Sequence, residues 1–435
     1  MEERKWESAP LVKGESISKQ GQNGAYAWLV MFICLAAAMS FVMISKALTP
    51  TMAEMCEYFG MDTVWGGSMS SLFGMITAII ILPLGAVLTK TSAKWVAILG
   101  LALIGIGAFL GGTVQTASLF FAARVVQGFG YGIMQAVGMT LVSRWFDEAH
   151  RGVPMGIYAA HVGLGGFLIN AVATPLMETW NWQALYIFIG IWCVVSIILM
   201  IIVVQDWPSQ GKLIEVKDGG EKKASFVDAL KVPSIWLMAG VFLAMGVGQQ
   251  GIGIFMKMIL MDLGQLDGAG ANAINSAISL GVIACTMIGG ALYTAVTNKA
   301  KKQRGLMLFI LVIVGASTLF GLLTFVHDTV TCWIFAMYFA LFCTLYLPGM
   351  YTLSAEHAGS PAMASMGLTI FMFGQFLGGM VGPILFGFVN TNMGGFAAAN
   401  WVVLALGIIA AICAFGVWML DRKLIAKQEA EKTAE

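Results

Sequence analysis

The residues best suited to chemistry are three cations inside long apolar stretches of the chain. Lys46 lies late in the apolar run 26–50, Arg124 begins R-V-V-Q-G-F-G, and Lys257 follows the run G-V-G-Q-Q-G-I-G-I-F. A charge at membrane depth costs several kcal/mol, so a cation of this kind is by default a candidate for function. For Lys46 the alternative is that its long side chain reaches the outer headgroups, because it lies near the end of its apolar run.

The acidic residues offer these cations no evident partner. The sequence holds 24 lysines and arginines and 23 acidic residues, nearly all outside the apolar stretches. Glu54 is assigned to an outer loop and Asp421 to the polar C-terminal tail. Three buried cations without a buried carboxylate are hard to explain as internal salt bridges. Either carbonyl and hydroxyl groups satisfy them, or a cavity of positive potential holds a small organic anion there.

Several uncharged residues are candidates for the same anion site. Arg124, Tyr131 and Gln135 are spaced by seven and four residues, which places them on one helical face. Each candidate also has a structural interpretation: Arg124 as a clamp on the carbonyls of a neighbouring helix, the glutamines as links between helices, the tyrosine as packing. The full set of predicted substrate contacts is Lys46, Lys257, Arg124, Tyr131, Gln135, Gln249, Gln250, Tyr346 and Gln375.

His161 is the candidate for proton coupling. It lies about ten residues into its apolar stretch, and histidine titrates near neutral pH. No aspartate or glutamate is predicted at the membrane centre, so His161 is the first candidate if transport is coupled to protons. The alternative is a buried histidine whose hydrogen bonds are satisfied by packing.

Composition indicates a membrane protein, and the sequence motifs give little support for an enzyme. Hydrophobic residues make up 59% of the 435 residues and charged residues only 11%, and the net charge is +1. Ordinary globular domains have about 25% charged residues. The seven cysteines are scattered without a C-x-x-C pair, and no hydrolase, zinc-protease or P-loop motif occurs. We expect no enzyme, no metal, no cofactor, no nucleic-acid partner and no cleavable signal peptide.

The apolar stretches predict an all-α protein with twelve transmembrane helices. They form two six-helix bundles, 25–204 and 233–420, separated by a polar linker, 205–232. All but three of the lysines and arginines then lie in segments on one side, which predicts that the tails 1–24 and 421–435 are cytoplasmic. The predicted spans are 25–49, 66–88, 95–114, 117–143, 152–177, 184–204, 233–258, 273–297, 305–326, 330–354, 363–390 and 397–420.

The first and seventh spans share a pattern. A tryptophan precedes the lysine in each, Trp28 before Lys46 and Trp236 before Lys257. If the two halves are structural repeats, the lysines face one another across a central cavity; a chance match is the alternative.

Several stretches resemble the major facilitator superfamily. Residues 124–130 match its R-x-x-Q-G-x-G motif, and G-A-V-L-T-K-T-S-A-K (85–94) partly matches its loop motif between the second and third spans. The segments N-G-A-Y-A-W-L-V (23–30) and S-K-A-L-T (45–49) resemble the monocarboxylate transporters, and the related oxalate:formate antiporters have a similar general pattern. That resemblance implies that Lys46 binds substrate.

Together these features predict a secondary transporter of an organic anion, most simply a carboxylate. It would work by alternating access, with proton symport or anion exchange, as a monomer in the lipid bilayer of the cell membrane. The aromatic and methionine content also fits an efflux transporter of hydrophobic drugs. A third alternative, a membrane sensor or scaffold without transport, would need a signalling domain that the sequence does not show.

Overall fold

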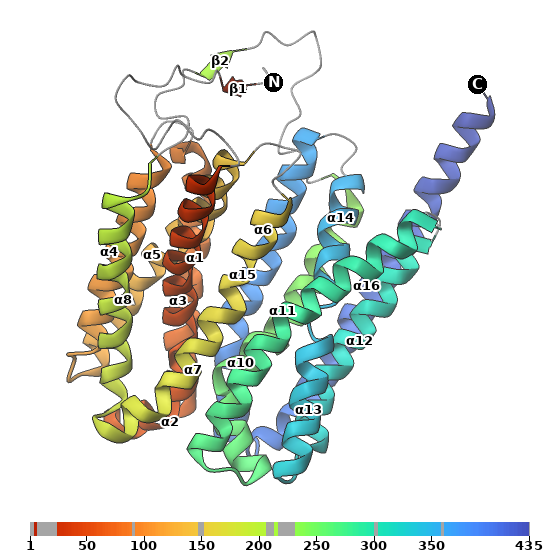
Figure 1. Ribbon diagram of the computed structural model, residues 1–435. Coiled ribbons are helices and arrows are strands. Elements are labelled where there is room, and N and C mark those ends of the chain that lie inside the picture. The colour runs from red at the N-terminus through yellow and green to blue at the C-terminus, as the bar shows by residue number, and fades with distance from the viewer. Residues whose placement is uncertain are drawn as a thin grey trace, which may run out of the picture. The chain divides into compact units, whose positions relative to one another are not determined.

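The fold of the described residues is almost entirely helical (Figure 1). The computed structural model describes residues 4–6, 24–88, 92–146, 152–205, 213–215, 231–299, 303–357 and 361–434. In these residues, 11 helices are long and apolar enough to cross a membrane. The prediction of an all-α, multi-pass membrane protein is therefore confirmed at this level.

The count of twelve spans remains a prediction. The predicted span 117–143 coincides with α5 (Ala117–Trp145), which is 29 residues long but is not one of those 11 helices. The cytoplasmic placement of the two tails also remains a prediction, and most of the tail 1–24 and of the linker 205–232 lies outside the described residues. The described parts of these two segments form an antiparallel pair of short strands, β1 (Arg4–Trp6) and β2 (Leu213–Glu215), in which Arg4 lies opposite Glu215.

The described chain forms two compact units. The first comprises Met1–Ala47, Ile76–Ile169 and Pro175–Lys223, and the second comprises Leu48–Met75, Asn170–Thr174 and Ala224–Glu435. The second unit also includes two pieces from the N-terminal half of the sequence, so the two units do not divide at one point of the chain. The division into two six-helix bundles at the linker remains a prediction.

In the first unit, α4 (Ala93–Gly111) packs against both α5 and α8 (Trp182–Ile202), and α1 (Ala25–Lys46) packs against the same two helices. Close approach of α4 and α5 depends on Gly130, since a Cβ at this position would lie 2.6 Å from the carbonyl oxygen of Gly100. Ser92 caps α4 and Asn181 caps α8, each accepting from a backbone N–H of the first turn. The helices of the first unit are α1 (Ala25–Lys46), α4 (Ala93–Gly111), α5, α6 (Gly152–Ala159), α8 (Trp182–Ile202), the second half of α3 (Thr63–Leu88) and, except for its residues 170–174, α7 (His161–Thr179).

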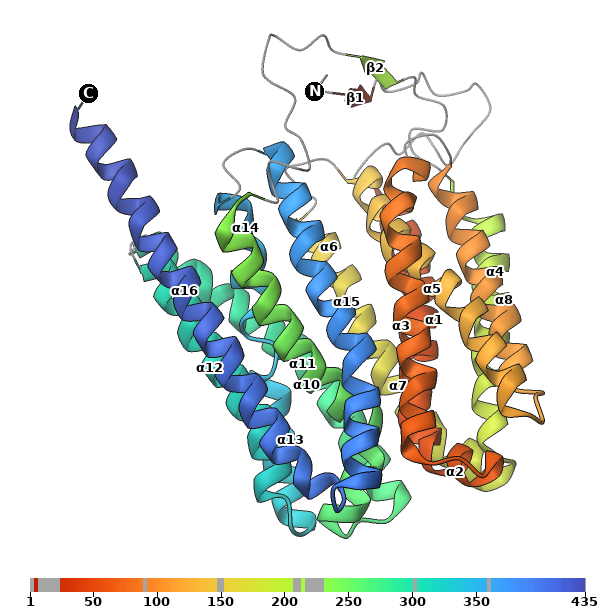
Figure 2. The same ribbon diagram turned by 180° about the vertical axis from the view of Figure 1, so that it is seen from behind.

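In the second unit, α10 (Pro233–Gly264) and α15 (Pro361–Asn392) lie side by side, and α16 (Ala399–Ala434) runs along α12 (Arg304–Phe325) and on to the C-terminus (Figure 2). Asp328 forms a capping box with Thr331 at the start of α13. Its helices are α2 (Leu48–Phe59), the start of α3, α10 (Pro233–Gly264), α11 (Gly268–Lys299), α12 (Arg304–Phe325), α13 (Thr329–Phe342), α14 (Leu347–His357), α15 (Pro361–Asn392), the short η3 (Phe396–Ala398) and α16 (Ala399–Ala434).

Glycines along one face of α15 form the seam with α10. A Cβ at Gly374, Gly378 or Gly382 would lie between 2.4 and 2.7 Å from backbone atoms of α10. Their spacing of four residues places them in one row on the helix. This row of glycines lets the backbones of α10 and α15, two helices of the same unit, approach closely.

Three predicted spans are interrupted in the structure. The first continues beyond residue 49 as α2, the fifth divides into α6 and α7 at Ala160, and the tenth divides into α13 and α14 around residues 343–346. Discontinuous helices at membrane depth are tolerated where other groups satisfy the freed backbone, and they often mark binding sites. Each interruption lies beside a residue predicted to contact substrate or protons.

Candidate functional site

Arg124 joins three helices of the first unit. Its side chain is fully buried, and Nη1 donates to the carbonyl oxygen of Ile44 on α1 (3.2 Å) and to Oε1 of Gln127 (2.8 Å). Gln127 in turn donates from Nε2 to the carbonyl oxygen of Gly107 on α4 (2.7 Å). Arg124 and Gln127 thus hold α1, α4 and α5 together, which is the clamp interpretation of Arg124; a substrate role remains a prediction.

Lys46 is the last residue of α1 and is half-buried. It lies two residues beyond Ile44, the residue whose carbonyl binds Arg124. The clamp therefore fixes the turn of α1 that ends in Lys46, so any role of Lys46 depends on Arg124 for its position.

Tyr131 and His161 both contact Phe41. The ring centroids of Tyr131 and Phe41 are 5.2 Å apart, edge to face, and those of Phe41 and His161 are 5.0 Å apart. His161 Nδ1 lies 2.6 Å from the carbonyl oxygen of Tyr158 at the break between α6 and α7, and the residue is only 8% exposed. The structure thus brings two predicted residues into one aromatic cluster, while proton coupling by His161 remains a prediction.

Gln135 completes the predicted face of α5. It is half-buried, and its side-chain oxygen accepts no hydrogen bond from the described residues. A buried amide oxygen without a donor is unusual in a folded protein and is available to a ligand.

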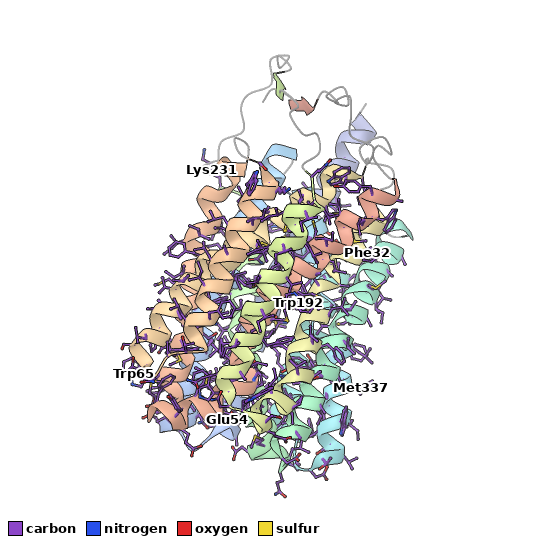
Figure 3. All side chains as sticks on the ribbon, turned by 60° about the vertical axis from the view of Figure 1, so that its left-hand side comes forward. Phe32, Glu54, Trp65, Trp192, Lys231 and Met337 are labelled. Atoms are coloured by element: carbon purple, nitrogen blue, oxygen red, sulfur yellow. The ribbon has the colours of Figure 1, made fainter. Side chains whose placement is uncertain are left out.

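Lys257 does have a carboxylate partner, so the prediction that it lacks one is wrong. Nζ lies 2.6 Å from Oε1 of Glu54 and donates to the carbonyl oxygen of Pro50 (2.8 Å); the lysine is 3% exposed. Glu54 lies in α2, not in a loop. In the second unit, Glu54 and Trp65 lie at the end opposite Lys231 (Figure 3).

Glu54 could have been found from the sequence only if the helix had been extended past Pro50. Lys46, Pro50 and Glu54 are spaced four residues apart. Because α2 begins at Leu48, Pro50 falls in the first turn of that helix, where its missing N–H has no helical acceptor. The proline therefore does not end the helical segment.

A second buried acid lies near the C-terminal end of the described chain. Asp421 on α16 is 0% exposed, receives a hydrogen bond from Nε of Arg304 (2.8 Å), and lies 3.0 Å from Nε2 of His357. The backbone N–H of Gly305 also donates to it (3.1 Å). Asp421 is the first residue of the predicted tail 421–435; α16 continues through it, and three groups satisfy its charge.

The break between α13 and α14 positions two further predicted residues. Gln249 Nε2 donates to the carbonyl oxygen of Cys343 (3.1 Å), and Tyr346 is buried against Phe242, with ring centroids 6.1 Å apart. The N–H of Thr344 meets the thiol of Cys285 at 3.4 Å. Side chains from α10 and α11 therefore satisfy the backbone that the break releases.

Gln250 and Gln375 are less enclosed. Gln250 is exposed and lies next to Gly379, whereas Gln375 is half-buried on α15 and its backbone lies against Gly246. The predicted facing pair of Lys46 and Lys257 belongs to two different units and remains a prediction. In the described part of the chain, no three histidine, cysteine or acidic side chains could hold a metal ion, and the seven cysteines are not joined in disulfide bonds.

Replacing Arg124 with lysine should destabilise the protein by about 2 kcal/mol, because an ammonium group cannot reproduce the planar guanidinium contacts with Ile44 and Gln127. Thermal unfolding of the purified variant tests this. Gln127→Leu should destabilise the protein to a similar extent, since Arg124 loses an acceptor. Unchanged unfolding temperatures for both variants would contradict the clamp.

The family model of the Major Facilitator Superfamily matches residues 30–367. The chain therefore belongs to this superfamily, whose members are transporters rather than enzymes. A solved structure, a bacterial homologue of the human lysosomal transporter Spinster in an inward-facing and unoccupied conformation, agrees in fold with a TM-score of 0.69. It is 14% identical and covers 92% of this chain and 98% of its own.

Curated relatives transport several kinds of substrate. A probable L-galactonate transporter of Escherichia coli (strain K12) is 25% identical over 31% of this chain, and monocarboxylate transporter 12 of Mus musculus is 21% identical over 39%. The multidrug efflux pump SdrM of Staphylococcus aureus (strain N315) is 30% identical over 40%. These matches span only 30%, 35% and 37% of the respective relatives' lengths. With an oxalate:formate antiporter also among the relatives, the resemblance inferred from the sequence is confirmed.

Proposed function

We propose that this protein is a secondary active transporter of a small organic carboxylate across the cell membrane. The observation that supports this most is Lys46, a half-buried cation at the end of α1, in a turn that the fully buried Arg124 holds in place. Lys46 also lies in the segment that resembles the substrate-binding lysine segment of the monocarboxylate transporters.

In this proposal Lys46 forms a charge-assisted contact with the substrate carboxylate. Tyr131 and Gln135 lie on the same face of α5 as Arg124 and contribute hydrogen bonds, and the unpartnered oxygen of Gln135 accepts from a hydroxyl group of the substrate. Lys257, Gln249, Gln250, Tyr346 and Gln375 provide the contacts from the C-terminal half.

The transport cycle that we propose is alternating access of two six-helix bundles, with cytoplasmic termini and with symport of protons or exchange of anions. His161 carries the coupled proton in the symport form of the cycle. The names of the relatives favour this substrate class, since galactonate, oxalate and formate are carboxylates.

The second candidate is efflux of hydrophobic compounds, and the match to the multidrug pump SdrM favours it. A thermal-shift experiment separates the two candidates. Carboxylates should raise the unfolding temperature of the purified protein, because a ligand that binds only the folded state stabilises it. The matched uncharged amides should not do so. Stabilisation by lipophilic cations and by no carboxylate would reject the carboxylate proposal in favour of efflux.

A further inference from the structure

The ion pair of Lys257 and Glu54 is asymmetric. The ammonium group is almost fully buried, while the Glu54 side chain remains 40% exposed. Of the three donors of an ammonium group, one meets Glu54 and one meets the carbonyl oxygen of Pro50. The lysine is therefore fixed in the protein, and the glutamate is its more accessible partner.

Glu54 is bound through only one of its two oxygens. Oε1 meets Lys257, whereas Oε2 is buried and accepts no hydrogen bond from the described residues. A carboxylate held firmly in a protein usually has acceptor sites on both oxygens satisfied. Glu54 is thus less tightly held than Asp421, whose two oxygens both accept hydrogen bonds.

Among the residues that the structure describes, Glu54 is the acid that forms an ion pair with Lys257. Gly268, the first residue of α11, faces the methylene stem, and a Cβ there would lie 3.4 Å from Cε. The neighbouring Asp267 is engaged elsewhere, because its Oδ1 accepts from the backbone N–H of Gly270 (2.9 Å). Losing Glu54 without a replacement would leave a buried ammonium group uncompensated, which is strongly unfavourable.

We propose that Glu54 is the resident counter-ion of Lys257 and that the carboxylate of the substrate replaces it on the ammonium group during transport. This inference rests on the proposed carboxylate transport. Glu54 has the same chemistry as the substrate and so competes with it. Without substrate, Glu54 neutralises Lys257 and allows the empty carrier to complete its cycle; with substrate, the incoming anion neutralises it.

The test uses Glu54→Gln in the full-length protein in proteoliposomes, with a labelled carboxylate that the wild type transports. Without its competitor, the substrate should bind about tenfold more tightly. Exchange of internal for external substrate should persist, because both steps proceed with Lys257 occupied by substrate. Net uptake should fall at least about fivefold, because the empty carrier now has an unpaired Lys257.

Two further variants make the test specific. Glu57→Gln removes an exposed carboxylate one turn further along α2 and should match the wild type. Glu54→Asp keeps the charge and should have much of the net uptake of the wild type. If Glu54→Gln does not fold, the substrate affinity and net uptake of Glu54→Asp still test the proposal.

The proposal is overturned if Glu54→Gln has wild-type affinity and a wild-type ratio of net uptake to exchange. Weaker substrate binding in Glu54→Gln also overturns it, since Glu54 would then support the site rather than compete for it. If the wild type transports no carboxylate at all, the proposed function itself fails and this inference fails with it. That result is distinguishable because it appears before any substitution is made.

Discussion

Lys46→Ala should lower carboxylate uptake at sub-saturating concentration by about 30-fold or more. A hydrogen bond to a charged group contributes about 1.5–3 kcal/mol, and 2 kcal/mol corresponds to about a 30-fold change in affinity. The measurement is the initial rate of uptake into proteoliposomes that contain equal amounts of folded protein.

The control for this experiment is Lys423→Ala, which removes an exposed lysine of α16 beyond its apolar part. This variant should transport like the wild type. The unfolding temperature of Lys46→Ala should remain close to that of the wild type, because Lys46 is only half-buried. Equal carboxylate uptake by Lys46→Ala and the wild type would remove Lys46 from the site.

Gly382→Ala should produce the largest loss of stability, about 3 kcal/mol. A Cβ at residue 382 would lie 2.4 Å from the carbonyl oxygen of Val247 and 3.0 Å from the amide nitrogen of Gly251. Both atoms belong to the backbone of α10, so no change of rotamer relieves the overlap and α10 and α15 must separate. Thermal unfolding in detergent measures the effect.

Gly253→Ala is the matched control, since it lies on α10 and a Cβ there meets no atom within 4 Å. This substitution should leave stability unchanged or raise it by up to about 1 kcal/mol, because alanine favours a helix over glycine. If Gly382→Ala unfolds at the same temperature as Gly253→Ala, the described seam between α10 and α15 is incorrect.

Much of the helical architecture could be predicted because each span needs about 20 apolar residues, and length and composition are local properties. The interruptions of the helices could not be predicted in this way. Residues 343–346 are as apolar as their neighbours, and the break exists because Gln249 and Cys285, from distant parts of the chain, satisfy its backbone. The continuation of the first span as α2 lies beyond the apolar run 26–50, and Pro50 is compatible with it because it occupies the first turn of a new helix.

The candidate site was predictable in its residue types and less so in its partners. The cost of their charges marks Arg124 and Lys46 as candidates. The structural interpretation of Arg124, a clamp on the carbonyls of a neighbouring helix, does not say which carbonyl, and the structure supplies Ile44. The partner of Lys257 is 203 residues away in sequence, so no local pattern could reveal it. His161 and Tyr131 both contact Phe41 on a third helix, an arrangement that likewise depends on tertiary packing.

Carboxylate transport is tested most directly by uptake of labelled small carboxylates by the wild-type protein in proteoliposomes, with protein-free liposomes as the blank. We expect saturable accumulation that unlabelled carboxylates inhibit and the corresponding amides do not. Absence of uptake for every carboxylate tested, together with transport of lipophilic cations by the same preparation, would contradict the proposed carboxylate transport.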